Sequence, residues 1–214
     1  MTLSAVVTTL CLLCSLAAWN ATAGNWQFSI QDQYGDPLED AVVELVPLHQ
    51  TAAASVTTPQ ATIKQQGLNF VPFVSAVQVG TLIDFPNLDR TRHHVYSFSA
   101  AKMFEIQLYH DQPEAPVEFD APGIVALGCN IHDYMEAYIF ISESHLFAVT
   151  NEKGQAHFDA LPEGEYQLTI WHPFQQKDYP PSQLSVSEQS GMSQHQLDVI
   201  HRPKQPTPQR GFGS

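Results

Sequence analysis

Short runs of apolar and β-branched residues, each closed by Gly, Pro, Asn or Asp, recur along most of the chain. Residues 79–85, 104–109 and 136–141 have this composition, which is typical of β-strands. In the second run, alternation predicts one face toward the core and one outward: Phe104, Ile106 and Leu108 inward, and Glu105, Gln107 and Tyr109 outward. No amphipathic helix pattern of useful length follows Gly24, so the sequence predicts an all-β fold.

Two further strand-rich segments flank this central part. Residues 28–45 contain two apolar runs around a Gly-Asp-Pro turn, and residues 149–170 contain two more runs. One sandwich could span the whole mature chain. The alternative, which we favour, is one domain inserted into an exposed loop of another, an arrangement that proteins tolerate when the inserted termini lie close together.

Composition suggests where the inserted domain begins and ends. Residues 51–62, rich in Ala, Thr, Ser and Gln, would lead into it, and residues 142–145 would lead back. The C-terminal segment is polar and rich in Pro and Gly, so we expect it to be disordered. The predicted division is a first part of the outer domain at 24–59, an inserted domain at 60–142, a second part of the outer domain at 143–200 and a tail at 201–214.

Residues 1–23 combine an apolar stretch with a terminal Ala-Thr-Ala, which is typical of a secretory signal peptide cleaved before Gly24. No Lys or Arg precedes the apolar stretch, so a short membrane anchor is the alternative. We expect export to the periplasm. Cys11 and Cys14 would leave with the signal, and the mature chain would keep Cys129 alone.

A lone cysteine in an exported protein can pair with another molecule, stay buried and inert, or act as a nucleophile or metal ligand. Cys129 follows Gly128 and precedes His132 and Met135, so one short loop carries a thiol, an imidazole and a thioether. A Cys-His nucleophilic pair would need an oxyanion-hole glycine cluster or an orienting Asn or Asp, and no such pattern accompanies it. The loop therefore favours a metal site.

Copper fits these donors best. A mononuclear electron-transfer copper takes a thiolate and two imidazoles near one plane, with a weak axial thioether. The second imidazole can come from His93 or His94, at the start of a separate predicted strand. Met135 could instead be ordinary core filling. The other histidines show no ligand spacing and are interpreted as surface or structural residues: His49, His110, His145, His157, His172, His195 and His201.

Over roughly residues 60–142 the chain resembles the cupredoxins, the plastocyanin and amicyanin group of blue copper proteins, of the kind called methylamine utilization protein. Residues 68–80 are similar to the family's early strand, and Phe85 with Asn87 is similar to its Phe-x-Asn strand end. In the plastocyanin pattern the first ligand histidine follows that phenylalanine by eight positions, which is His93 here.

The Cys-x2-His-x2-Met spacing is similar to that of amicyanin. The resemblance implies one type 1 copper in a Greek-key β-sandwich. The implied metal ligands are His93, Cys129, His132 and Met135. Leu127 stands where the family usually has an aromatic residue and His94 where it has Asn, and both departures change groups that tune the redox potential.

The flanking segments resemble a second family, the carboxypeptidase-regulatory-like β-sandwiches. Residues 149–158 and the Leu-Pro-x-Gly-x-Tyr pattern at 161–166 are similar to the second half of that fold, and residues 28–45 are similar to its first half. Together the two resemblances imply a cupredoxin sandwich inserted into a regulatory-like sandwich.

The chain carries a formal net charge of −13, and residues 1–23 hold none of it. This balance disfavours nucleic acid as a partner. The negative charge serves either solubility or docking to a basic partner. Asp133 and Glu136 place part of this charge close to the ligand loop, where such a partner would dock.

These observations predict a periplasmic carrier of single electrons that has no enzyme activity, because no substrate site or second ligand set is visible. Its partner would be a redox protein such as a c-type cytochrome or a periplasmic dehydrogenase, with no membrane contact after signal cleavage. The alternatives are a copper-binding protein for storage, delivery or sensing, and a carbohydrate-binding-like exported module, for which fold analogy is a weak warrant.

Overall fold

The computed structural model describes residues 23–49, 58–187 and 190–201. The predicted signal peptide up to Thr22, most of the leading linker and nearly all of the predicted tail lie outside these ranges, whereas Ala23 already belongs to the first strand. Within them the chain forms strands β1 to β17 and no helix, which confirms the predicted all-β class. In this part of the chain, accordingly, no helix is long and apolar enough to cross a membrane.

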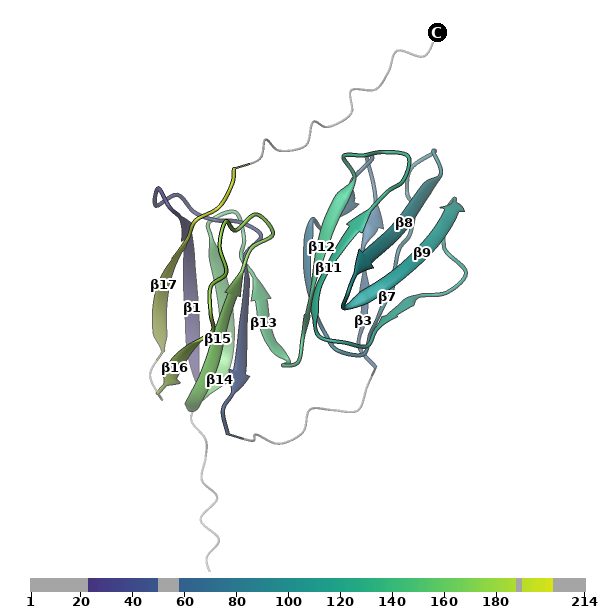
Figure 1. Cartoon of the computed structure of the whole chain (residues 1–214). Helices are drawn as coiled ribbons and strands as arrows, with labels where there is room; N and C mark the ends of the chain where they lie inside the picture. The colour runs from purple at the N-terminus through teal and green to yellow at the C-terminus, as the bar shows by residue number, and fades with distance from the viewer. Residues whose placement is uncertain (1–22, 50–57, 188–189, 202–214) are drawn as a thin grey trace, which may run out of the picture.

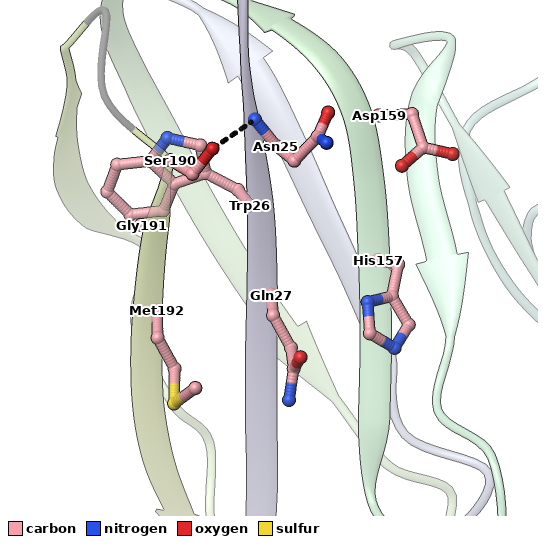
Figure 2. Close-up of a pocket in the computed structure, with 8 residues that line it drawn as sticks. All are labelled: Asn25, Trp26, Gln27, His157, Asp159, Ser190, Gly191 and Met192. Atoms are coloured by element: carbon pink, nitrogen blue, oxygen red, sulfur yellow. Dashed lines mark hydrogen bonds between the residues drawn. The ribbon is translucent and has the colours of Figure 1, made fainter.

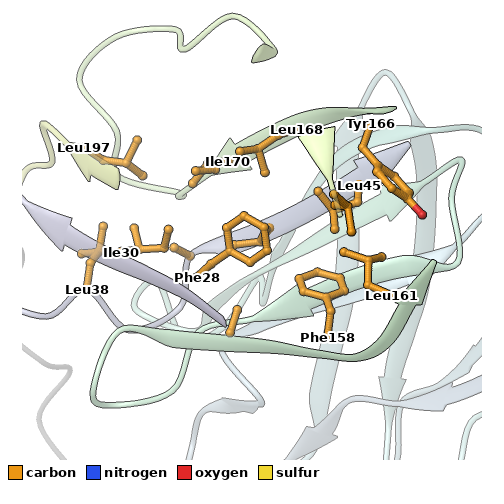
Figure 3. Close-up of a cluster of buried hydrophobic side chains, with 14 of the residues drawn as sticks. Phe28, Ile30, Leu38, Leu45, Phe158, Leu161, Tyr166, Leu168, Ile170 and Leu197 are labelled. Atoms are coloured by element: carbon orange, nitrogen blue, oxygen red, sulfur yellow. The ribbon is translucent and has the colours of Figure 1, made fainter. Parts of the chain in front are cut away.

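The split sandwich, so named because its strands come from both sides of the chain, packs two sheets of order β14-β1-β17 and β13-β2-β15-β16. Phe28, Tyr166 and Leu161 are fully buried between the two sheets (Figure 3). Its strands are β1 (Ala23–Asp32), β2 (Val42–Pro47), β13 (Leu146–Val149), β14 (Gln155–Pro162), β15 (Gly164–Trp171), β16 (Ser182–Val186) and β17 (Gly191–Leu197).

The central sandwich, residues 60–142, packs a five-stranded sheet of order β6-β12-β11-β8-β9 against a three-stranded sheet of order β10-β7-β3, beside the pair β4-β5. Phe85, Phe119 and Ile139 are fully buried in its core. Its strands are β3 (Gln60–Thr62), β4 (Lys64–Gln65), β5 (Phe70–Val71), β6 (Val74–Gln78), β7 (Thr81–Asp84), β8 (His93–Ser99), β9 (Lys102–Tyr109), β10 (Val117–Phe119), β11 (Gly123–Gly128) and β12 (Glu136–Ser142).

The two sandwiches stand side by side, with β12 and β11 toward the split sandwich and β8 and β9 away from it (Figure 1). A third apolar cluster joins them: Val42 of β2 is buried with Val74 and Phe140, and Trp171 packs on Phe140 with ring centroids 6.0 Å apart. Because this cluster draws side chains from both sandwiches, we expect them to stabilise each other. Whether each folds alone stays a prediction.

The predicted alternation along residues 104–109 is wrong at its end. The pairing of β8 with β9 shifts between His93 and Val95, so a β-bulge inserts one extra residue into β9. As a result Leu108 is 47% exposed, whereas Tyr109 turns toward the core. The bulge lies beside the first residue of β8 and so shapes the end of the sandwich where the predicted ligands gather.

Candidate metal centre

Three side chains from two separate segments meet at one end of the central sandwich. His93 begins β8, whereas Cys129 and His132 lie in the loop between β11 and β12. Because β8 runs antiparallel to β11, the start of one lies beside the end of the other. The potential ligand atoms of the three side chains all lie within 4.8 Å of one another. Two nitrogens and a sulfur at such separations can converge on one metal ion.

The ligand loop is a compact turn. Sγ of Cys129 lies 3.7 Å from Nδ1 of His132, and the backbone N–H of Met135 donates to the carbonyl of His132 at 2.9 Å. Met135 is 1% exposed and belongs to the same buried cluster as Cys129. It therefore lies in the core at the end of the loop, a position that suits both an axial ligand and core filling.

His93 is fully buried, and a carboxylate on the preceding loop holds its ring. Its Nε2 lies 2.9 Å from Oδ2 of Asp89, and the two oxygens of that carboxylate also accept the backbone N–H groups of Gly67 (Oδ1) and Leu68 (Oδ2). Nδ1 of His93 is buried and has no hydrogen-bond partner among the described residues. Burial by itself lowers the pKa of His93, but the nearby Cys129 thiol and Asp89 carboxylate raise it overall. The imidazole is thus fixed with one nitrogen free for a metal.

The environment of Cys129 favours its thiolate. Burial alone would raise the pKa of this thiol, but the His93 side chain, the backbone N–H groups of His94 and Ile131, and the His132 side chain lower it to about 6. The thiolate is the form that binds metals. Cys129 is only 3% exposed, so we expect its sulfur to be sheltered from bulk oxidants.

His94 points away from this cluster. Its Nε2 lies 2.7 Å from Oε1 of Glu105 on the neighbouring strand β9, and its ring is tilted against that of Tyr96 with centroids 5.6 Å apart. The contact of His94 with the site is through its backbone N–H, directed at Cys129. Of the two candidate histidines, the structure therefore brings His93 and not His94 to the other predicted ligands.

Buried polar groups anchor the segment that precedes His93. Nε2 of Gln65 donates to the carbonyl of Phe85, and Asn87 donates to the carbonyls of Thr91 and Tyr109. Gln65 is fully buried and Asn87 is 2% exposed. These bonds fix the chain on both sides of Asp89, so the ligand histidine enters β8 in a defined direction.

Sequence reasoning did not find Asp89. Its spacing of four residues before His93 was an available signal, because metal-binding histidines commonly donate their second N–H to a carboxylate. The other seven histidines contribute nothing to this group, which is the one cluster of three or more His, Cys, Asp or Glu side chains with metal-binding geometry in the described ranges.

A shallow groove crosses the outer face of the β14-β1-β17 sheet in the split sandwich (Figure 2). Gln27, His157 and Met192 lie next to each other on its three strands. The indole of Trp26 is occupied by packing across Gly191, where an added Cβ would come within 2.6 Å of the ring. The groove thus lacks a free aromatic platform, and it adds nothing in favour of a carbohydrate-binding module.

No protein-family model matches the chain, and no curated protein matches its sequence. Among solved structures, a copper-containing nitrite reductase from Thermus scotoductus SA-01 is similar at 25% identity and a TM-score of 0.38. The match covers 46% of this chain and 26% of the reductase, so the chain spans about a quarter of that enzyme.

Two smaller proteins match over nearly their whole length. Amicyanin from Paracoccus versutus is 14% identical, covers 47% of this chain and 97% of its own, and has a TM-score of 0.34. A purple cupredoxin from Nitrosopumilus maritimus is 18% identical, covers 38% of this chain and 99% of its own, and also has a TM-score of 0.34. Because these TM-scores are below 0.5, we base the functional assignment on the side chains of this chain.

Proposed function

We propose that this chain is an exported, single-copper electron carrier whose central sandwich is a cupredoxin. The observation that carries the proposal is the convergence of His93, Cys129 and His132, with Met135 buried at the end of the same loop. A thiolate with two imidazoles and a thioether is the donor set of electron-transfer copper sites.

The donors fit copper better than zinc. Structural zinc sites use Cys, His and carboxylate ligands in closed tetrahedra, and a thioether is not among them. Soft thiolate and thioether sulfur instead select copper. The buried, unpartnered Nδ1 of His93 and the thiolate-favouring surroundings of Cys129 both supply the ligand forms that such an ion requires.

Bound copper would supply a one-electron change between Cu(I) and Cu(II). The protein's own groups keep the geometry constant during that change: Asp89 fixes the ring of His93, and backbone N–H groups hold the Cys129 sulfur. Burial of His93 and Met135 excludes water from one side of the site. His132 is half-buried and sits between the exposed Ile131 and Tyr134, so the other side approaches the surface.

Periplasmic location and partners remain proposals that rest on the sequence. The signal-like residues 1–23 and the net charge of −13 support an exported protein with a basic redox partner, such as a c-type cytochrome or a periplasmic dehydrogenase. The narrower resemblance to methylamine utilization proteins and the absence of enzyme activity are part of the same proposal.

Copper titration of the mature chain and of two matched variants tests the ligand set. His93→Ala should destroy the metal site, whereas His94→Ala should leave one equivalent of copper bound with a shifted affinity or potential. The reverse result would reassign the ligand to His94. Fast electron self-exchange between the oxidised and reduced wild-type forms would support a carrier, and slow exchange would favour copper storage or delivery.

A further inference from the structure

The outer face of the five-stranded sheet in the central sandwich is only half covered. On β6 and β12 it packs against the split sandwich through Val74, Phe140 and Trp171. The part formed by β8 and β9 lies on the side away from that contact, and β11 stands between it and β12 (Figure 1). The face of β8 and β9 has no cover in the described part of the chain.

Large apolar side chains stand on the uncovered half. Phe98 is 77% exposed and Met103 is 70% exposed, and they are direct cross-strand partners on β8 and β9. Ala126 of β11 is exposed as well and pairs with Tyr138, a residue packed against the covered cluster. The apolar strip is therefore continuous with the contact between the two sandwiches, and its exposure suggests a binding surface.

A row of aromatic rings connects this strip to the metal centre. The ring of His94 lies 5.6 Å from that of Tyr96, and Tyr96 lies 5.1 Å from Phe98, centroid to centroid. At the inner end, the backbone N–H of His94 is directed at the sulfur of Cys129. The row thus runs from the buried sulfur to an exposed ring along one face of β8.

Tyr96 is also pressed against the strand that leads into Cys129. It pairs with Gly128, and a Cβ at Gly128 would come within 2.8 Å of the Tyr96 ring. Only glycine lets the ring lie this close to the backbone next to the ligand. The same contact gives a second short connection between the strip and the site.

We propose that the strip formed by Tyr96, Phe98, Met103 and Ala126 is the docking surface for a basic redox protein, and that His94, Tyr96 and Phe98 connect it to the copper site. This inference rests on the proposed function. In the transfer, one electron leaves the reduced protein and converts the partner's ferric haem to ferrous haem, and no proton moves.

Charge around the strip points to a cationic partner. Glu105, which is 56% exposed at the side chain, borders the strip on β9 next to Met103 and lies on the same face of the sheet. The chain as a whole carries −13. A partner with an apolar centre and a rim of Lys or Arg would therefore gain both burial of the strip and long-range attraction.

Binding of mitochondrial cytochrome c, a basic c-type cytochrome, tests the surface without relying on electron transfer. In NMR titrations of the full mature chain, the amides of Phe98 and Met103 should shift more than those of Ile131 and Tyr134 beside His132. Shifts confined to Ile131 and Tyr134, or no binding at all, would overturn the proposal.

A pair of double variants sharpens the test. Phe98→Ser with Met103→Ser should raise the Kd for the cytochrome roughly fivefold or more. The matched control, Tyr34→Ser with Met192→Ser, removes side chains that are 77% and 70% exposed on the split sandwich and should leave Kd within about twofold. Equal effects of the two double variants on the Kd would contradict the proposal. It would also be contradicted if the wild-type chain forms a dimer that the Phe98→Ser, Met103→Ser variant dissociates, because the strip would then be a dimer interface.

A substitution of Tyr96 tests whether the row of His94, Tyr96 and Phe98 carries the electron. In the copper-loaded chain with cytochrome at saturation, so that a change in Kd does not affect the result, Tyr96→Leu should slow electron transfer within the complex at least about tenfold while the visible spectrum stays as in the wild type. An unchanged rate would show that electrons leave by another route. A wild-type chain without the copper spectrum would instead contradict the proposed function, so the two failures are distinguishable.

Discussion

The Asp89 carboxylate lies 2.9 Å from Nε2 of His93 and so leaves Nδ1 as the nitrogen available at the centre of the site. The same carboxylate accepts the backbone N–H groups of Gly67 and Leu68. One side chain therefore orients the buried histidine and ties its loop to a neighbouring turn. We infer that Asp89 is a positioning residue for the proposed copper site.

Replacing Asp89 by Ala should lower copper affinity about 10- to 100-fold, since partners of this kind set ligand orientation. It should also reduce the free energy of unfolding by about 1–3 kcal/mol, because two backbone donors lose their acceptor. Copper titration and urea denaturation measure the two effects. Asp133→Ala, which removes an exposed charge near the loop without touching His93, is the control, and equal losses in both variants would contradict a positioning role.

The close approach of Tyr96 to Gly128 gives a second prediction. Gly128→Ala should destabilise the protein by about 1–3 kcal/mol, because the new methyl overlaps the ring. In a Tyr96→Ala background the same change should cost much less, since the overlapping atoms are gone. A double-mutant cycle by chemical denaturation measures this coupling, and additive effects would mean that the two residues do not meet as described.

His172 should make stability depend on pH. Burial lowers its pKa from 6.5 to about 4, although a hydrogen bond to the backbone of Glu39 opposes this shift and nearby His201 adds to it. Its Nδ1 accepts the N–H of Phe174, so the native state holds the neutral ring. The folded chain then binds fewer protons than the unfolded chain between pH 6.5 and about 4, and stability falls as pH falls through that window.

The loss should approach about 1.4 kcal/mol per pH unit within the window. Urea denaturation at pH 7, 6 and 5 measures it, with His172→Gln as the variant that cannot titrate. We expect the wild type to lose stability relative to the variant as pH decreases. Parallel pH curves for the two proteins would be inconsistent with a buried neutral His172.

Two phenylalanines on the same sheet face, one at the contact between the sandwiches and one on its open part, allow a matched comparison of stability. Phe140 is 8% exposed against Trp171, whereas Phe98 is 77% exposed on the open half. Phe140→Ala should cost about 3–5 kcal/mol and Phe98→Ala less than about 1 kcal/mol. Similar small costs at both positions, measured by thermal or chemical unfolding, would mean that the contact between the sandwiches adds little stability.

The same contact bears on the division predicted from sequence. A separate piece of residues 60–142 would expose Phe140 and Val74, which the split sandwich now covers. The separability of the two domains thus stays a prediction, and it is expected to hold only with a loss of stability. The buried hydrogen bond of Ser142 to Glu44 would be broken at the same time.

Sequence could reveal the ligand loop because its three donors lie within seven consecutive residues, where spacing alone implies proximity. It could not choose His93 from His94 without the family resemblance, since both begin the same strand. The alternation predicted an inward Leu108, which is wrong, because a bulge is set by the register of two strands and leaves no pattern in the sequence of either one. The contacts of Tyr96 with Gly128 and of Phe140 with Trp171 could not be predicted from the sequence, because each joins segments that meet only in the folded chain.

The visible spectrum of the copper-loaded mature chain reports on the proposed bond between Cys129 and copper. A thiolate held with two imidazoles around Cu(II) should give a strong thiolate-to-copper absorption band at one equivalent of copper. Cys129→Ser should remove the band, and Asp133→Ala should retain it. A colourless or weakly coloured wild-type complex would contradict the account of this chain as a blue copper electron carrier.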